Sequence, residues 1–494
     1  MSAQPNIVWI TLDSLKAAAL PMYGNTFTHT PNLSRLASEG ITFSNAFAQM
    51  PKCIPSRTSM ISGRYPHSDG LRVNRGRVGY EYTDPNTSLR RDDEFNLVSF
   101  LKEKGYHTGL KGPNHMLTEK RHRALFDARM ESGGGARKPP LPEPFDPVLR
   151  RMQFAGDIPA EFDMETYPDA NATRQFLAFL RGAKGKPFFG FLDLRVTHPW
   201  YWHIPPFRDL YRDMSIPVPP KAEFASAPLT DQIYRRVYDL ENVPPDAWRD
   251  LIRAYYSMAS YGDMLVGRVL DELDRLALAE NTIVIFSADH GDFAAEHGCV
   301  EKHDTFLYDC LVHLPLIIRY PGRIGAQRRF DGLAEFVDIA PTMMELASFD
   351  IPDWAQGQSA VGAIVRGEEY RHSVIAHGGL ERAVIDRTFR ADRAAIYQNK
   401  SAAYHGQYVI KQHAIMERPE FFMRAKMIRT KARKYIHRLN GDHELYDLRA
   451  DSHEIRNEIA NPAYASDAAK LREALLTRLI ESETNLPLVD YAWA

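Results

Sequence analysis

Asn6-Ile-Val-Trp-Ile-Thr-Leu-Asp13 is a short apolar run that ends on a carboxylate. The run Thr282-Ile-Val-Ile-Phe-Ser-Ala-Asp-His-Gly-Asp292 has the same form. Both patterns are typical of a buried strand in a parallel sheet that carries polar residues at its carboxyl end. Helical stretches lie between the two runs, for example 30–39, which Gly40 closes. Strands that alternate with helices predict an α/β fold with a parallel sheet.

The two terminal carboxylates suggest where a site lies, because ligands of open parallel sheets bind beyond the carboxyl ends of the strands. Asp13 and Asp289 are therefore expected to share one site. Hard divalent cations prefer carboxylate oxygens, and His290, directly after Asp289, adds an imidazole. This set predicts a metal site, against the plainer alternative that both aspartates only cap helices or turns.

The composition is that of an ordinary soluble protein, with 494 residues, 44% hydrophobic residues and a formal net charge of −2. Such a charge gives no basic field for nucleic acid or an anionic membrane, so neither is expected as a partner, whereas a homo-oligomer is compatible with it. The length exceeds one compact core. We expect a catalytic domain over residues 1–370 and a smaller α+β domain over 371–494, which ends in an amphipathic helix at 466–483.

Targeting signals are not visible in the chain. The N-terminus lacks a positively charged stretch, and the apolar residues 7–12 stop at Asp13, too early for a signal peptide. No apolar run approaches the roughly 20 residues that span a bilayer. Three cysteines are too few for a disulfide framework. We therefore expect a cytoplasmic protein in a reducing compartment.

The densest chemical motif is Met50-Pro-Lys-Cys-Ile-Pro-Ser-Arg57, with Ile61-Ser-Gly-Arg-Tyr-Pro66 shortly after it. A lone cysteine usually serves as a small apolar side chain. Here, however, Cys53-x-Pro-Ser-Arg57 followed by Ser62-Gly-Arg64 resembles the signature of the sulfatase family, in which the cysteine is oxidised to formylglycine. The similarity extends over nearly the whole chain, through segments 13, 21–24, 30–33, 37–40, 287–291, 296–298, 302, 314–322 and 444–448.

The resemblance implies an alkaline-phosphatase-like α/β sandwich, in which a large, mostly parallel sheet lies between helices and a smaller C-terminal α+β domain carries a short antiparallel sheet. It also implies a divalent metal, with calcium as first choice and manganese as second. The implied ligands are Asp13, Asp289, His290 and the oxygen that replaces the sulfur of Cys53. Ser14 stands where many members have a second acidic residue. His290 stands where many have asparagine, which resembles the phosphonate monoester hydrolase branch.

Formylglycine explains why a cysteine would be remade at this position. The hydrated aldehyde is a geminal diol, in which one hydroxyl attacks sulfur or phosphorus and the other, once deprotonated, expels the bound anion. The metal lowers the pKa of the attacking hydroxyl and holds the substrate oxygens. Arg57, four residues after Cys53, would face the same turn and suit the diol and metal, unless it only forms a structural fork onto carboxylates. Formylglycine-generating machinery is an implied partner.

Two implied residues act on the substrate. Lys302 matches the family lysine that contacts the transferring group and the leaving oxygen. His198, in Thr197-His-Pro-Trp200, matches the general acid for the leaving group, although a histidine before proline is more often structural. Both residues would also bind the substrate.

Two further matches are less complete. His115 matches the base that removes a proton from the diol, but Pro113 replaces the lysine of the family's Gly-Lys-x-His, so Lys111 or Asn114 would have to supply its contact. Asn74 resembles an asparagine that binds a substrate oxygen in the phosphonate hydrolase branch.

We expect a hydrolase that cleaves small-molecule sulfate esters. Hydrolysis of phosphonate monoesters or phosphodiesters by the same site is the alternative, because all these substrates present one negative charge at a tetrahedral centre. A third hypothesis is an unmodified family member that only binds anions. Loops at 132–147 and 201–219, rich in glycine and proline, would shape the mouth that selects the leaving group.

Overall fold

The computed structural model describes residues 4–69, 96–130, 135–142, 146–183, 185–380 and 418–483. A central eight-stranded sheet has the order β10-β2-β9-β7-β1-β5-β3, with β8 beside β2. Its strands are β1 (Asn6–Leu12), β2 (Ile41–Phe47), β3 (His107–Lys111), β5 (Phe188–Leu194), β7 (Thr282–Ala288), β8 (His313–Leu314), β9 (Leu316–Arg319) and β10 (Arg328–Glu335). β1 runs parallel to both β5 and β7, whereas β8 and β9 are antiparallel to their neighbours. The predicted α/β fold with a mostly parallel sheet is confirmed.

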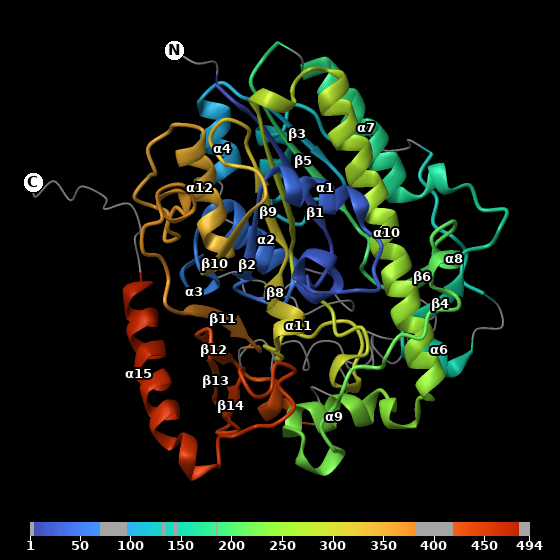
Figure 1. The fold of residues 1–494 in the computed structure, drawn as a ribbon, viewed down its shortest axis with the longest axis vertical. Helices are drawn as coiled ribbons and strands as arrows, with labels where there is room; N and C mark the ends of the chain where they lie inside the picture. The colour runs from blue at the N-terminus through green and yellow to red at the C-terminus, as the bar shows by residue number, and fades with distance from the viewer. Residues whose placement is uncertain are drawn as a thin grey trace, which may run out of the picture.

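Helices cover both faces of this sheet. Figure 1 shows α7 and α10 along one face and α4 and α12 beside the other. The helices are α1 (Pro31–Glu39), α2 (Cys53–Ser62), α3 (Pro66–Asp69), α4 (Leu97–Glu103), α5 (Glu119–Leu125), α6 (Pro147–Arg151), α7 (Pro168–Ala183), α8 (Arg208–Tyr211), α9 (Leu229–Val237), α10 (Pro245–Arg275), α11 (Asp309–Val312), α12 (Ile339–Leu346) and α15 (Ala465–Glu481). None of the described helices is long and apolar enough to cross a bilayer.

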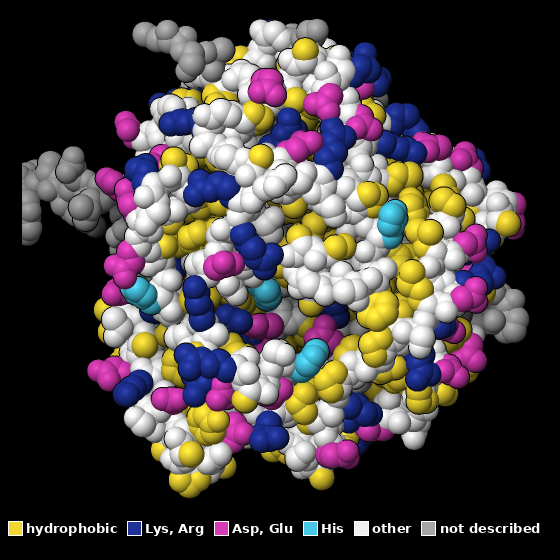
Figure 2. Space-filling view, viewed as in Figure 1, with side chains coloured by type: hydrophobic (Ala, Val, Ile, Leu, Met, Phe, Trp, Pro, Cys, Tyr) yellow, Lys and Arg dark blue, Asp and Glu magenta, His cyan; other side chains and the backbone are white. Residues whose placement is uncertain are grey.

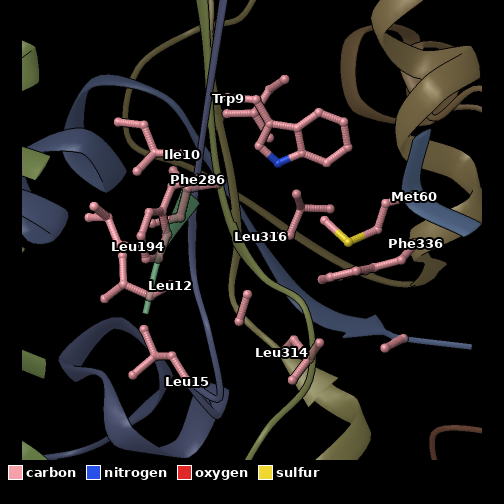
Figure 3. Close-up of a cluster of buried hydrophobic side chains, with 14 of the residues drawn as sticks. Trp9, Ile10, Leu12, Leu15, Met60, Leu194, Phe286, Leu314, Leu316 and Phe336 are labelled. Carbon is pink, nitrogen blue, oxygen red and sulfur yellow. The ribbon is translucent and has the colours of Figure 1, made fainter. Parts of the chain in front are cut away.

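The central strand β1 is buried along its whole length, and its side chains alternate between the two faces of the sheet. In Figure 3, Trp9 lies on the same side as Met60 of α2, whereas Ile10 and Leu12 point to the opposite side with Leu194. Burial on both faces is why the run is apolar without polar alternation.

The three central strands end at one level. Leu12 lies opposite Leu194 of β5 and opposite Ala288 of β7. The residues that follow these strands therefore meet at one edge of the sheet. Helix α10 passes close to this edge at Gly262, where a Cβ would come within 2.4 Å of the Leu12 side chain.

A smaller antiparallel sheet has the order β11-β12-β13-β14, and β4 (Phe154–Asp157) pairs with β6 (Tyr201–His203) elsewhere. The small sheet comprises β11 (Val374–Gly378), β12 (Ala425–Arg429), β13 (Arg433–Arg438) and β14 (Glu444–Asp447). Leu471 and Leu475 of α15 pack in its core, whereas Leu476 is 59% exposed. The sheet agrees with the predicted C-terminal α+β region, while the boundary at residue 370 stays a prediction.

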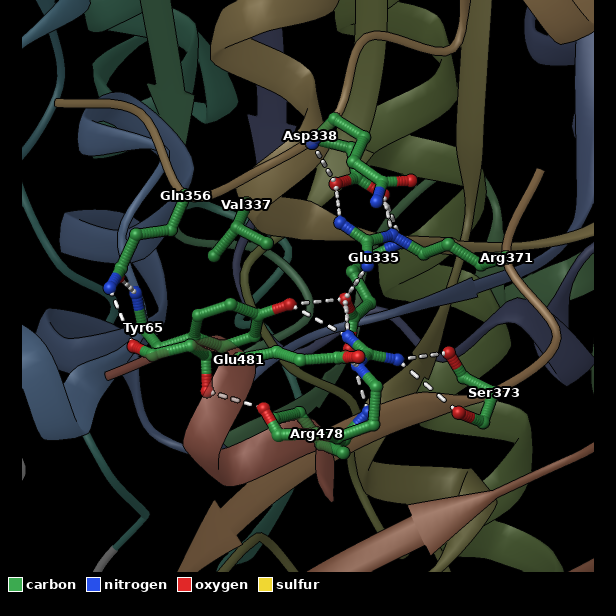
Figure 4. A network of polar contacts seen from close by, with 12 residues as sticks. Tyr65, Glu335, Val337, Asp338, Gln356, Arg371, Ser373, Arg478 and Glu481 are labelled. Atoms are coloured by element: carbon green, nitrogen blue, oxygen red, sulfur yellow. Dashed lines mark hydrogen bonds and ion pairs between the residues drawn. The ribbon is translucent and has the colours of Figure 1, made fainter. Parts of the chain in front are cut away.

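A buried polar network joins the two sheets (Figure 4). We call Tyr65, Glu335, Asp338, Arg371 and Arg478 the Glu335 network. Glu335 Oε2 accepts from Tyr65 at 2.5 Å and from Arg478 at 2.9 Å, and it pairs with Arg371 NH1 at 2.9 Å. Arg371 Nε also donates to Asp338 at 2.7 Å. These bonds tie α15 to the chain just after α2.

Candidate active site

Three aspartates meet beyond the level strand ends. Asp13 follows β1 and Asp289 follows β7, as expected, and both are buried. Asp193, near the end of β5, was not foreseen as a site residue, although Phe188–Leu192 followed by Asp193 repeats the pattern of an apolar strand that ends on a carboxylate. Thr11 Oγ1 donates to Asp193 at 2.7 Å and fixes its orientation.

Arg57 lies at the centre of these carboxylates and is fully buried. Its Nε donates to Asp289 Oδ2 at 2.8 Å, its NH2 lies 3.2 Å from Asp13 Oδ2, and its NH1 pairs with Asp193. The fork onto carboxylates, considered above as the structural alternative, is therefore present. Three carboxylates surround one guanidinium, which leaves an excess of negative charge.

Cys53 begins α2 and faces the same point. Its Sγ lies 3.1 Å from His290 Nε2, and the helix N-terminus, with its positive end, lies at Cys53. His290 Nδ1 donates to the carbonyl of Gly291 at 2.8 Å, so Nε2 carries the free lone pair. One donor atom from each of Asp13, Cys53, Asp289 and His290 lies within 4.8 Å of the others.

The electrostatics of the site suit a cation. Burial opposes ionisation of Asp289, but the charge and hydrogen bond of Arg57, together with His290, hold the pKa of the carboxyl below its usual value. Burial lowers the pKa of His290, which keeps the imidazole neutral. Two carboxylates and a neutral imidazole are a donor set that fits calcium or manganese. Ser14, in place of a second acidic residue, donates its hydroxyl to Asp13 Oδ1 at 3.1 Å.

Burial also changes the chemistry of Cys53. Desolvation, and next Asp13, raise the pKa of the thiol above its usual value. A neutral thiol is a poor nucleophile. An unmodified cysteine therefore gains no reactivity from these neighbours.

His198 and Lys302 form a pair on the other side of Cys53. Lys302 Nζ lies 2.6 Å from His198 Nε2, and His198 Nδ1 donates to the Pro199 carbonyl at 2.8 Å. Burial and the Lys302 ammonium lower the pKa of His198 to about 4, so His198 is neutral and Nε2 accepts from Lys302. In this hydrogen bond Lys302 is therefore the donor, and the general-acid role of His198 stays a prediction.

His115 joins the same cavity, as predicted. Its Nδ1 is buried and has no hydrogen-bond partner among the described residues. Burial, and next Arg57, lower its pKa to about 3, so it is neutral and able to accept a proton. Of the two residues that could replace the missing lysine, Lys111 donates to the Arg129 carbonyl, and Asn114 Nδ2 donates to the Leu117 carbonyl.

A cavity of about 510 Å³ opens over this constellation. It is lined by Asp13, Lys52, Cys53, Ile54, His115, Lys138, Pro139, Leu141, Tyr167, Pro168, Arg195, His198, Pro199, Trp200, Trp202, Glu301 and Lys302. Of the two loops expected at its mouth, 132–147 contributes Lys138 and Leu141. The second contributes Trp202, but its Pro217–Pro219 part lines a separate cavity. Asn74 lies outside the described residues.

Lys52 and Arg195 are two cations at this cavity that the sequence did not single out. Lys52 Nζ lies 3.1 Å from the buried Asp304 carboxylate. Arg195 directly follows β5 and has an exposed side chain. A basic residue beside a motif gives no signal by itself, so only the fold shows where these charges lie.

Comparison with known proteins finds relatives over most of the chain. The model of the family described as Sulfatase matches residues 5–349. An arylsulfatase of Clostridium perfringens is 26% identical over 96% of this chain and 94% of its own length. The human iduronate 2-sulfatase is 28% identical over 70% of each chain.

Solved structures show the same fold. A 2-O GAG sulfatase has a TM-score of 0.72 and 22% identity over 97% of this chain and 93% of its own. The phosphonate monoester hydrolase of Silicibacter pomeroyi has a TM-score of 0.74 and 19% identity, over 98% and 96%.

Proposed function

Since this chain belongs to the sulfatase family and is a sulfuric ester hydrolase, we propose that it uses a formylglycine formed from Cys53 and a calcium ion bound by Asp13, Asp289 and His290. Manganese is the second candidate. The observation that carries the proposal is the cluster of four donor atoms, within 4.8 Å of one another, at the start of α2. The cluster holds more acid than Arg57 neutralises.

A divalent metal bound here polarises an ester oxygen and lowers the pKa of a hydroxyl beside it. The chain's own residues prepare that position. Arg57 holds one oxygen of Asp13 and one of Asp289, which fixes both carboxylates without cancelling their charge. Backbone N–H groups of Ser14 and His290 donate to the other oxygen of Asp289, at 3.2 and 2.9 Å.

Formylglycine, when hydrated, supplies a hydroxyl as nucleophile and a second hydroxyl whose deprotonation releases sulfate. His115 is the proposed base, because its neutral ring has a buried nitrogen without a partner among the described residues. In the family this histidine follows a lysine, whereas here Pro113 holds no charge. Lys52, which lines the same cavity, is the nearest chain neighbour of Cys53 with a cationic group.

The leaving group departs toward the His198–Lys302 pair. The short contact between Lys302 Nζ and His198 Nε2, with the lowered pKa of His198, supports Lys302 as the donor in this pair. We assign Lys302 the donation of that proton to the leaving oxygen and His198 the orientation of the ammonium. Asn74 remains a candidate for binding a substrate oxygen.

Hydrolysis of phosphonate monoesters is the second candidate, and His290 is the observation that favours it. Its imidazole occupies a place where many sulfatases have an amide, and it contacts Cys53 directly. A phosphonate monoester presents the same single charge at a tetrahedral centre as a sulfate monoester.

Peptide mass spectrometry of protein from its native host tests the modification. We expect residue 53 as an aldehyde in place of a thiol, and Cys53→Ala should fold but lose turnover of both an aryl sulfate and a phenyl phosphonate. Cys310→Ala, at another buried cysteine, is the control and should keep turnover. Full activity in protein whose residue 53 is an unmodified thiol would contradict the mechanism. Wild-type protein that binds both anions but turns over neither would favour a non-catalytic anion-binding protein. The ratio of kcat/KM for the two substrates decides between the two activities.

A further inference from the structure

A second cavity, of about 1000 Å³, adjoins the active-site cavity. The two share Lys138, Pro168 and Arg195 as lining residues. Gly112 and Pro113 line the second cavity, while His115, at the end of the same turn, lines the first. A molecule bound with one end at Cys53 can therefore extend past Arg195 into the second cavity.

The second cavity is strongly basic. Five cationic side chains line it: Arg123, Arg129, Arg137, Lys138 and Arg195. Among its described lining residues the one acid is Glu119, which Arg123 Nε binds at 2.7 Å. Five cations and one acid leave an excess of four positive charges, in a chain whose net charge is −2. The face in Figure 2, by contrast, mixes Lys and Arg with Asp and Glu.

Three of these cations have no acidic partner in the described part of the chain. The Arg129 guanidinium donates only to backbone carbonyls, at 2.9 Å to Arg123 and 3.3 Å to Phe126, so its charge is held in place but not cancelled. The side chains of Arg137 and Arg195 form no ion pair or hydrogen bond with the residues described. Backbone bonds position both: Arg195 N donates to Asp169 at 2.9 Å and Arg137 N to Thr166 at 2.7 Å.

Asn171 provides a second, independent sign of a ligand. This side chain lines the cavity and is only 1% exposed, and its Nδ2 has no hydrogen-bond partner within the described ranges. Its Oδ1 is already bound by Arg174, at 2.6 Å. A buried amide donor without a partner is costly, and an anionic oxygen in the cavity would satisfy it.

We propose that this cavity binds a second anionic group, a carboxylate or a further sulfate, on the leaving-group side of the substrate. The preferred substrates are then sulfate esters of acidic or multiply sulfated sugars, rather than esters of neutral alcohols. The inference rests on the proposed function, because the shared residues give the second cavity its relation to Cys53. Guanidinium groups bind carboxylate and sulfate oxygens in a fixed, paired geometry, which suits either group.

The experiment compares kcat/KM for three substrates: a sulfated disaccharide that contains a uronic acid, the same disaccharide with its carboxyl group reduced, and a disulfated disaccharide. Wild type should prefer the first and third over the second. The double variant Arg137→Gln/Arg195→Gln should reduce that preference by about 10-fold or more, because each lost charged hydrogen bond is large enough for such a change. Arg236→Gln, an exposed arginine outside both cavities, is the matched control and should keep the preference.

The outcomes separate the two proposals. Equal selectivity in wild type and the double variant overturns the second-anion site, even if sulfate esters are cleaved well. If wild type cleaves no sulfate ester, including an aryl sulfate, the proposed function fails instead. The subsite is then tested by calorimetric titration of Cys53→Ala with the disulfated disaccharide, in which the arginine substitutions must weaken binding by about 10-fold for the inference to stand. Loss of preference for only one acidic substrate identifies the group that the cavity recognises.

Discussion

Two buried charge clusters in this protein use the same side chains and have opposite balance. At the strand ends, Arg57 is surrounded by Asp13, Asp193 and Asp289. In the Glu335 network, two acids face two arginines, with Tyr65 as a further donor. Both clusters join segments far apart in sequence, and both lie out of water.

The difference shows how a site can be told from a structural network. A buried charge is costly unless it is paired, so a cluster with equal numbers of acids and arginines is complete. The cluster with two uncompensated acids is not, and a bound cation would complete it. Burial raises the pKa of Asp193 to about 6, although Arg57 opposes this, and the nearby Asp13 carboxylate adds a smaller increase. Charge balance, rather than burial, therefore separates the two regions.

The largest effect is expected when an acid is removed from the unbalanced cluster around Arg57. Asp289→Asn keeps the shape of the side chain but removes a metal ligand, and activity should fall on the order of 10³-fold because charge stabilisation by the metal is lost. Stability should change little, since one of three mutually repelling acids is gone. Elemental analysis should find no bound metal, and thermal unfolding reports the stability. Full metal occupancy in this variant would show that Asp289 is not a ligand.

The balanced cluster should respond in the opposite way. Arg371→Met leaves Glu335 and Asp338 with one arginine fewer, and the free energy of unfolding should fall by about 3–5 kcal/mol, because a buried acid loses its partner. Turnover per folded molecule should stay unchanged. Urea unfolding measures the free energy of unfolding. Kinetic assays normalised by active-site titration measure the turnover per folded molecule. Arg366→Met, in an exposed pair with Glu368, is the control and should leave the free energy of unfolding nearly unchanged, because solvent screens such a pair. A similar loss in both variants would contradict the distinction.

A smaller effect is expected at Lys302, the cation that lies beside the unbalanced cluster. Lys302→Arg keeps the positive charge but holds its proton too tightly to donate it, and Lys302→Ala removes both. The alanine variant should lose about 10²-fold in kcat/KM. Both should depend more steeply than wild type on the pKa of the leaving group, as measured with a graded series of aryl and alkyl sulfates.

His198→Ala separates the two members of this pair. If His198 only orients the Lys302 ammonium, its loss should lower kcat/KM. The slope of kcat/KM against the pKa of the leaving group should then change less than in the Lys302 variants. A steeper slope in His198→Ala alone, with no change in either Lys302 variant, would return the acid role to His198.

The sequence was sufficient for features that one segment determines. The apolar runs before Asp13 and Asp289 are local patterns, and the structure has them as β1 and β7, whereas the start of α2 at Cys53 was not predicted. Asp193 shows the same signal and was overlooked. The contacts of Lys111 and Asn114 could not be predicted from the sequence, because each side chain donates to a backbone carbonyl whose position depends on the fold.

Features that depend on contacts between distant segments could not be predicted from the sequence. The Glu335 network brings residues 65, 335 and 478 into contact, and no local spacing indicates their pairing. The basic cavity likewise combines Arg123 in α5, Arg137 in a loop and Arg195 after β5. Charges scattered along the sequence reveal a common site only when strand order and helix packing are known.

The position of β1 between β5 and β7 sets a time limit for any enzyme that modifies Cys53. The folded protein leaves Cys53 only 4% exposed within the active-site cavity, so an enzyme that binds an extended peptide around Cys53 would have to act before the sheet closes. β1 cannot be enclosed until Ala288, the last residue of β7, has left the ribosome. At the usual rate of synthesis, the intervening chain takes on the order of tens of seconds to make. Because β7 is synthesised late, Cys53 would stay accessible during translation and become buried only when the sheet forms.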